Sequence, residues 1–296
     1  MASSMGAALP ARADDAQTRY PLVLAHGMAG FSNFGPIQYW HGIPSALRAR
    51  GAVVHVTSVS AFNSSELRGQ QLLAQVRRIL AETGAGKVHL IGHSHGSHAA
   101  RYVAGLQPEW VASVTAVSGP VKGSPVADAV YRLSQWGGPL LTKLVSKGVN
   151  GVGHLVAWLS MRSLPQDSYA TLLSLTTEGS AQFSVHFPAG VPLTEEGDGE
   201  HEVRGVRYYS WGGVGQFYNP WNPFDYLSKG TARLFKGQPN DGLVGRCSSH
   251  LGMVIRDDYR LNHFHSVNQL LGLVAKDVDP VALYVEHAQR LKQAGL

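Results

Sequence analysis

A serine bracketed by two glycines, Gly92-His93-Ser94-His95-Gly96, limits more than any other segment how this chain can fold. An apolar run at residues 87–91 leads into it, and a helical pattern at residues 97–106 follows it. Gly-x-Ser-x-Gly between a strand and a helix is typical of a nucleophile elbow, whose sharp turn needs glycine on both sides and exposes the serine Oγ. The pattern predicts that Ser94 is a nucleophile. A glycine-rich turn with an incidental serine is the alternative, and the strand-turn-helix setting disfavours it.

Predicted strands and helices alternate along much of the chain. Apolar or β-branched runs predict strands at residues 20–25, 53–57, 87–91, 111–117 and 207–211. Apolar residues at helical spacing predict helices at residues 44–48, 65–80, 97–106 and 281–291. This alternation predicts an α/β fold, with a mostly parallel sheet covered by helices on both faces. A length of 296 residues, 44% of them hydrophobic, fits one large domain, here residues 14–296.

The rhythm changes after the fourth predicted strand. From Val126 to Leu164 the sequence has amphipathic helical segments interrupted by glycines. Burial in the hydrophobic core could explain the apolar residues, but glycine hinges and amphipathic helices favour a mobile lid. We therefore expect a helical lid insertion at about residues 126–164.

The N-terminal residues suggest export from the cell. Residues 1–9 are small and apolar, and Pro10-Ala11-Arg12-Ala13 ends in an Ala-x-Ala step. This pattern is typical of the end of a secretory signal, with the basic start and most of the apolar region missing. Residues 1–13 are therefore interpreted as a signal remnant of a secreted protein, and a disordered leader is the alternative.

Charge and apolar runs exclude several classes of partner. The net charge is +5, but lysine and arginine are scattered and lack the interleaved aromatic residues of a nucleic-acid groove. A solvated surface explains the charge, with at most weak attraction to anionic lipid. No apolar run reaches the roughly 18 residues of a membrane span, so stable membrane insertion is not expected.

A nucleophilic serine needs a histidine to take its proton and an acid to orient that histidine. In the α/β-hydrolase fold the chain order is serine, acid, histidine. Among the late histidines, His263 follows Asn262 in a polar loop before an expected helical stretch at residues 267–273. His250 and His265 are its rivals.

The acid and the oxyanion donors follow from position. Asp241 comes after a plausible strand and opens an Asn-Asp-Gly turn. Spacing alone favours Asp241 no more than the three other candidate aspartates taken together, which are Asp225, Asp257 and Asp258. The negative oxygen of the tetrahedral intermediate needs backbone N–H donors. We expect them at His95, which follows the nucleophile, and at Met28 in the loop after the first strand. A merely tight turn at His26-Gly27 is the alternative.

These motifs together resemble the true lipases of the Pseudomonas and Burkholderia type, bacterial lipase family I. The likeness spans nearly the whole mature chain and is carried by residues 20–28, 39–44, 68–73, 90–96, 208–211, 240–245, 247–257 and 262–263. The resemblance implies the α/β-hydrolase fold, a triad of Ser94, Asp241 and His263, and oxyanion donors at Met28 and His95.

The resemblance also implies a function and partners. It implies a secreted triacylglycerol lipase that cleaves long-chain esters at an oil-water interface beneath an amphipathic lid. A periplasmic, membrane-anchored foldase often assists such lipases. One alternative is a short-chain esterase or polyester depolymerase with the same triad. A more remote one is a non-catalytic α/β-hydrolase that binds lipid or a partner protein, and the complete set of triad residues argues against it.

Two departures from the family pattern stand out. The family disulfide would pair Cys247 with the position of Glu196, so this chain, with one cysteine, has none. The family's calcium ion is held by two aspartates and two carbonyls, which correspond here to Asn222 or Asp225, to His265, and to the Gln269 and Leu273 carbonyls. Because Ca²⁺ prefers anionic oxygen ligands, an imidazole in place of a carboxylate predicts that neither calcium nor another cofactor is required.

Overall fold

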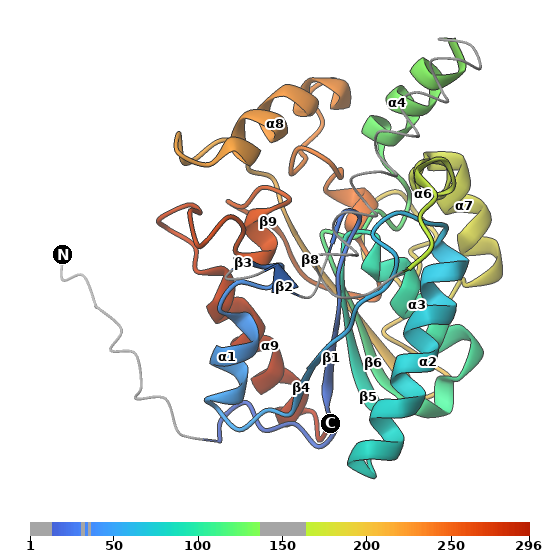
Figure 1. The fold of residues 1–296 in the computed structure, drawn as a ribbon, viewed down its shortest axis with the longest axis vertical. Helices are drawn as coiled ribbons and strands as arrows, with labels where there is room; N and C mark the ends of the chain where they lie inside the picture. The colour runs from blue at the N-terminus through green and yellow to red at the C-terminus, as the bar shows by residue number, and fades with distance from the viewer. Residues whose placement is uncertain (1–13, 31–32, 35–36, 137–163) are drawn as a thin grey trace.

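The chain folds around a seven-stranded sheet, which the computed structural model shows together with its helices (Figure 1). The structure describes residues 14–30, 33–34, 37–136 and 164–296. The predicted signal remnant at residues 1–13 and the larger part of the predicted lid, residues 137–163, lie outside the described residues.

The sheet is mostly parallel, as predicted. Its strands follow the order β4 (Val54–Val56), β1 (Leu22–Ala25), β5 (Val88–His93), β6 (Val111–Val117), β8 (Val206–Gly213) and β7 (Glu202–Val203), with β9 (Met253–Tyr259) also paired to β8. Within this sheet only the β7–β8 pair is antiparallel. The short strands β2 (Asn33–Phe34) and β3 (Ile37–Gln38) pair antiparallel with each other.

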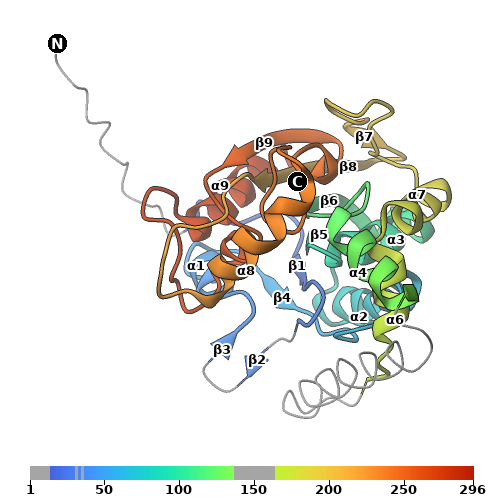
Figure 2. The ribbon, with the colours of Figure 1, turned by 90° about the horizontal axis from the view of Figure 1, so that it is seen from above.

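Helices cover both faces of the sheet (Figures 1 and 2). On one face lie α2 (Ser65–Thr83) and α3 (Gly96–Leu106), and on the other α1 (Ile43–Arg48) and α9 (Pro280–Gln293). One end of the sheet carries α4 (Pro125–Trp136), α6 (Ser168–Leu175) and α8 (Pro223–Thr231), and α7 (Thr177–His186) packs on α6. Short 3₁₀ turns are η1 (Pro108–Trp110), η2 (Ala232–Phe235), η3 (Cys247–Ser249) and η4 (His265–Val267).

Two hydrophobic cores, one on each face, hold these layers together. Strand side chains alternate in direction, so Val23 joins the core under α2 and α3, whereas Leu22 and Leu24 join the core under α1 and α9. All three are fully buried. Burial on both faces explains why the strands of the parallel sheet read as continuous apolar runs.

Three local predictions differ from the structure. The expected helical stretch at residues 267–273 is wrong: η4 ends at Val267, and Asn268 and Leu271 adopt left-handed backbone conformations (φ 61° and 51°) that stop a helix. The strand expected before Asp241 is also wrong, because only an isolated bridge joins Asn240 to Gly245. Strand β9 was not predicted, since its half-exposed residues, rich in charge, lack an apolar pattern.

Buried histidines make the fold sensitive to acid. Burial lowers the pKa of His26, His89 and His98 from 6.5 to about 3. Between these two pH values the unfolded chain binds protons that the folded chain does not, so the free energy of unfolding falls as the pH falls. Each histidine contributes about 1.4 kcal/mol per pH unit below its unfolded pKa. We expect most of the stability to be lost between about pH 6 and pH 4.

Urea unfolding at a series of pH values measures this loss. The variant His89→Gln can keep the hydrogen bond that His89 Nδ1 makes with Ser113 Oγ (2.8 Å) but does not titrate. The free energy of unfolding of this variant should change less steeply with pH, by the amount that the uptake of about one proton contributes. An unchanged slope in this variant would contradict the assignment.

Candidate active site

The turn between β5 and α3 places Ser94 at the end of the sheet where α4 and α6 lie. Ser94 has a left-handed backbone (φ 53°), held by hydrogen bonds from its N–H to the Val117 carbonyl and from the Ser97 N–H to its own carbonyl, both 2.9 Å. A Cβ at Gly92 would collide with the backbone of Gly96, and one at Gly96 with the Ala25 carbonyl. Both glycines are therefore required by close backbone approach, as an elbow predicts.

The predicted acid and base lie together. His263 Nδ1 lies 2.9 Å from Asp241 Oδ2, and both side chains are buried. Asp241 Oδ1 accepts the N–H groups of Leu243 (2.9 Å) and Val244 (2.7 Å), which fixes the carboxylate in its turn. With the carboxylate as acceptor, Nδ1 carries the imidazole proton, and Nε2 is left as the basic nitrogen.

The rival acids and bases form pairs of their own. His250 Nε2 contacts Asp257 (2.9 Å), His265 Nε2 contacts Asp225 (2.8 Å), and Asp258 forms an exposed ion pair with Arg256. None of these side chains lines the cavity that contains Ser94. The structure brings Ser94, Asp241 and His263 together and leaves the rivals elsewhere.

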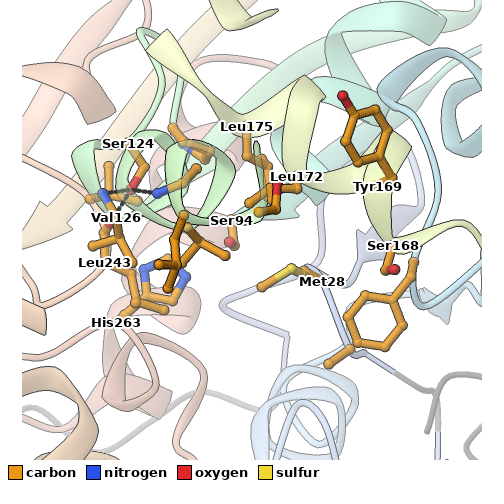
Figure 3. Close-up of a pocket in the computed structure, with 18 residues that line it drawn as sticks. Met28, Ser94, Ser124, Val126, Ser168, Tyr169, Leu172, Leu175, Leu243 and His263 are labelled. Atoms are coloured by element: carbon orange, nitrogen blue, oxygen red, sulfur yellow. Dashed lines mark hydrogen bonds between the residues drawn. The ribbon is translucent and has the colours of Figure 1, made fainter. Parts of the chain in front are cut away.

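An apolar cavity of about 470 Å³ opens over Ser94 and His263 (Figure 3). In the close-up, Ser94, His263 and Met28 point into the same space. The described part of the predicted lid, α4, contributes to the wall, together with α6. The principal apolar residues of the wall are Met28, Val126, Val130, Leu133, Leu172, Leu175 and Val244.

The loop of the predicted oxyanion donor Met28 is held by a buried arginine. Arg68 donates to the carbonyls of His26 (2.6 Å) and Gly27 (3.0 Å). His26 Nδ1 donates to the Gly27 carbonyl, and its Nε2 accepts the Val59 N–H (3.1 Å). This arrangement needs a neutral imidazole, and burial together with the positive Arg68 lowers the pKa of His26 to about 3. These hydrogen bonds therefore hold the loop at neutral pH, where His26 is uncharged.

The two predicted oxyanion donors, Met28 and His95, flank the serine. Across the part of the chain that the structure describes, the backbone N–H of neither residue donates a hydrogen bond. Ser65 Oγ lies 2.9 Å from His95 Nε2 and thereby fixes the His95 side chain behind the elbow. Two unused donors beside Ser94 are suited to bind a negatively charged oxygen.

A chain of hydrogen bonds, which the sequence did not reveal, joins the three loops of the site. The Gly27 N–H donates to Tyr39 Oη (2.9 Å), Tyr39 Oη donates to His93 Nδ1 (2.6 Å), and His93 Nε2 donates to the His263 carbonyl (3.0 Å). His93 directly precedes Ser94 in the elbow and is too close in sequence to act as its base. Its burial and its two partners show that it connects the elbow to the loop of His263 instead.

The residues of the family calcium site do not fit a cation in this chain. Asn222 Nδ2 donates to the carbonyls of Gln269 (3.1 Å) and Leu273 (2.8 Å), which would be calcium ligands. His265 Nε2 lies against Asp225, whose carboxylate is wholly buried and already hydrogen-bonded. N–H groups thus occupy the oxygens that a calcium ion would need. In the described ranges of the chain, no group of three or more acidic, histidine or cysteine side chains could hold a metal ion.

A nucleophile elbow and a histidine-aspartate pair at one end of a parallel sheet define the class of α/β-hydrolases. Residues 20–266 match the model of the alpha/beta hydrolase fold family. A triacylglycerol lipase of Vibrio cholerae is 51% identical over 95% of this chain and 90% of its own length. One of Pseudomonas fragi is 42% identical over 96% of this chain and 99% of its own length.

Solved structures agree on the fold. The Staphylococcus hyicus lipase covers 93% of this chain with a TM-score of 0.64 at 17% identity, and the match spans 97% of that lipase. EstA from Clostridium botulinum covers 93% of this chain, with 87% of its own length matched, a TM-score of 0.62 and 16% identity. The chain belongs to the α/β-hydrolase family and, within it, to the family of bacterial triacylglycerol lipases. Over the described residues, no helix is both long and apolar enough to cross a membrane.

Proposed function

We propose that this chain is a triacylglycerol lipase in which Ser94 is the nucleophile, His263 the general base and acid, and Asp241 the group that orients His263. Ser94 Oγ attacks the ester carbonyl carbon while His263 Nε2 takes the serine proton. The carbonyl oxygen becomes negative and accepts the N–H groups of Met28 and His95. Asp241 holds the Nδ1 proton and stabilises the imidazolium ion that forms.

The second half of the cycle uses the same groups. His263 gives its proton to the leaving glycerol oxygen, the C–O bond breaks, and an acyl-serine remains. Water then enters, His263 takes one of its protons, and the hydroxide oxygen attacks the acyl carbon. Collapse of the second intermediate returns the proton to Ser94 Oγ and releases a fatty acid. Apart from the ester and water, every group that reacts in these steps belongs to the chain.

The apolar cavity above Ser94 supports a lipid substrate most directly. Its wall carries aliphatic side chains from α4 and α6, which can bury an acyl chain beside the reacting carbonyl. Rates on tributyrin, triolein and a solid polyester test the proposal. A clear preference for triolein is expected, whereas activity confined to short or polymeric esters would favour an esterase or a polyester depolymerase.

Narrowing the cavity should change the acyl-chain preference. Leu172 on α6 lines the cavity close to Ser94 (Figure 3). We expect Leu172→Trp to lower kcat/KM for triolein about tenfold more than for tributyrin, because the indole fills space that only the long chain uses. Val185→Trp, an exposed position on α7 outside the cavity, is the matched control and should leave the ratio of the two rates unchanged. Equal loss on both substrates in Leu172→Trp would place the acyl chain elsewhere.

Export and assistance in folding complete the proposal. The Ala-x-Ala step at residues 11–13 supports secretion through the periplasm, and the lipase family of the chain supports a dedicated foldase there. We also propose that residues 126–164 act as a lid, supported by the position of α4 in the cavity wall. Yield of active enzyme with and without a co-expressed lipase foldase tests the partner.

A further inference from the structure

A buried carboxylate beside the loop of His263 has four hydrogen-bond donors. Asp225 Oδ2 accepts the N–H groups of Tyr218 (2.6 Å) and Asn219 (2.7 Å). Asp225 Oδ1 accepts Asn262 Nδ2 and His265 Nε2, both at 2.8 Å. Four donors at these distances satisfy both oxygens, so the charge of this fully buried side chain is compensated by the protein itself.

Asn222 makes the second half of this cluster. Its Oδ1 accepts the Phe224 N–H (3.0 Å) and caps α8, while its Nδ2 donates to the carbonyls of Gln269 and Leu273. An amide NH₂ group presents two partly positive hydrogens to two carbonyl oxygens, which is the role a cation has between carbonyl ligands. The side chain is fully buried, and it ties α8 to the turns that follow His263.

The cluster holds the loop of the catalytic histidine on both sides. Asn262, which precedes His263, donates to Asp225, and its Oδ1 accepts the N–H groups of Phe264 (3.1 Å) and His265 (2.9 Å). His265, two residues after His263, contacts Asp225 directly. A shift of these bonds would move the His263 ring relative to Ser94, and small displacements of catalytic groups cost large factors in rate.

We propose that Asn222 and Asp225 form a metal-free clamp, in which the Asn222 amide takes the place of the family calcium ion and positions His263 for catalysis. The clamp rests on the proposed function only in that His263 is the base. Asn222 and Asp225 are positioning residues, since neither lines the cavity above Ser94.

Removal of the amide alone tests the positioning role. Asn222→Ser keeps an oxygen that can cap α8 and loses the two N–H bonds to the carbonyls. We expect kcat for p-nitrophenyl butyrate to fall about tenfold, with KM changed less than about twofold, because the substrate cavity is untouched. Asp279→Ala is the control. It removes a similar side-chain cap from α9, none of whose residues lines the cavity, and should lower the melting temperature without lowering kcat.

Calcium rescue tests whether the amide occupies the cation position. The double variant Asn222→Asp/His265→Asp would offer two carboxylates and the Gln269 and Leu273 carbonyls, a set of hard oxygen ligands. In excess EDTA we expect the double variant to lose activity and to melt at a lower temperature. Excess Ca²⁺ should restore both and Mg²⁺ should not, because Mg²⁺ needs a smaller and more regular site. The unmodified enzyme should respond to neither EDTA nor Ca²⁺.

Three results would overturn the clamp. One is a fall in activity or melting temperature of the unmodified enzyme in EDTA that Ca²⁺ reverses, because a metal ion would then hold the loop. Another is an unchanged kcat in Asn222→Ser, and the third is a double variant that Ca²⁺ stabilises no better than Mg²⁺. An unmodified enzyme without esterase activity would instead contradict the proposed function, and the melting temperatures would still test the clamp.

Discussion

Ser94→Ala is expected to lower kcat for ester hydrolysis about a million-fold, the largest effect of any single change in this chain. The substitution removes only Oγ, and with it the atom that forms the bond to the acyl carbon. The two backbone hydrogen bonds that hold the elbow, at Val117 and Ser97, remain. A φ of 53° is as strained for alanine as for serine, so the melting temperature should hardly change. Hydrolysis of p-nitrophenyl butyrate and thermal unfolding measure the two effects.

Ser113→Ala is the matched control for this loss. Ser113 is a buried serine of β6 whose Oγ contacts His89, remote from the cavity. Its removal should cost stability and leave kcat intact, the opposite of the effect at Ser94. An organophosphate probe should label one serine in the unmodified enzyme and none in Ser94→Ala. Substantial turnover or labelling in Ser94→Ala would mean that another serine is the nucleophile.

The parts of the site that local sequence determines could be predicted. The elbow is one turn, and its two glycines are required by backbone contacts within a few residues and with the neighbouring strand, so the pentapeptide and its flanks were sufficient for Ser94. The sheet was predictable for a related reason. Parallel strands buried on both faces need apolar runs, and the strands beneath α2 and α9 have them.

The residues that depend on tertiary contacts were less accessible. Spacing alone could not separate Asp241 from Asp225 and Asp257, because each of the three aspartates is paired with a histidine in the folded chain. Which pair faces the serine depends on how the loops after β8 and β9 pack. The link from Tyr39 through His93 joins residues 54 positions apart and then reaches His263. No local pattern marks such a link.

These three histidine-aspartate pairs also supply the second large prediction. Asp241→Asn is expected to lower kcat about ten-thousand-fold near neutral pH while the chain remains folded. The amide oxygen can still accept the Leu243 and Val244 N–H groups, but the amide nitrogen then faces His263 Nδ1. Nδ1 must become an acceptor, so the proton moves to Nε2, and Nε2 can no longer take the proton of Ser94. Steady-state kinetics and a melting curve of the purified variant measure both effects.

Asp257→Asn separates this effect from the general loss of an ion pair. Asp257 accepts from His250 Nε2 at 2.9 Å, the same distance that joins His263 to Asp241, but the pair lies outside the cavity. Its loss should leave kcat within about twofold of the unmodified enzyme. A kcat of Asp241→Asn that also stayed within about tenfold would mean that Asp241 does not fix the tautomer of His263. A large loss in Asp241→Asn alone would tie the chemistry to the pair whose histidine lines the cavity together with Ser94.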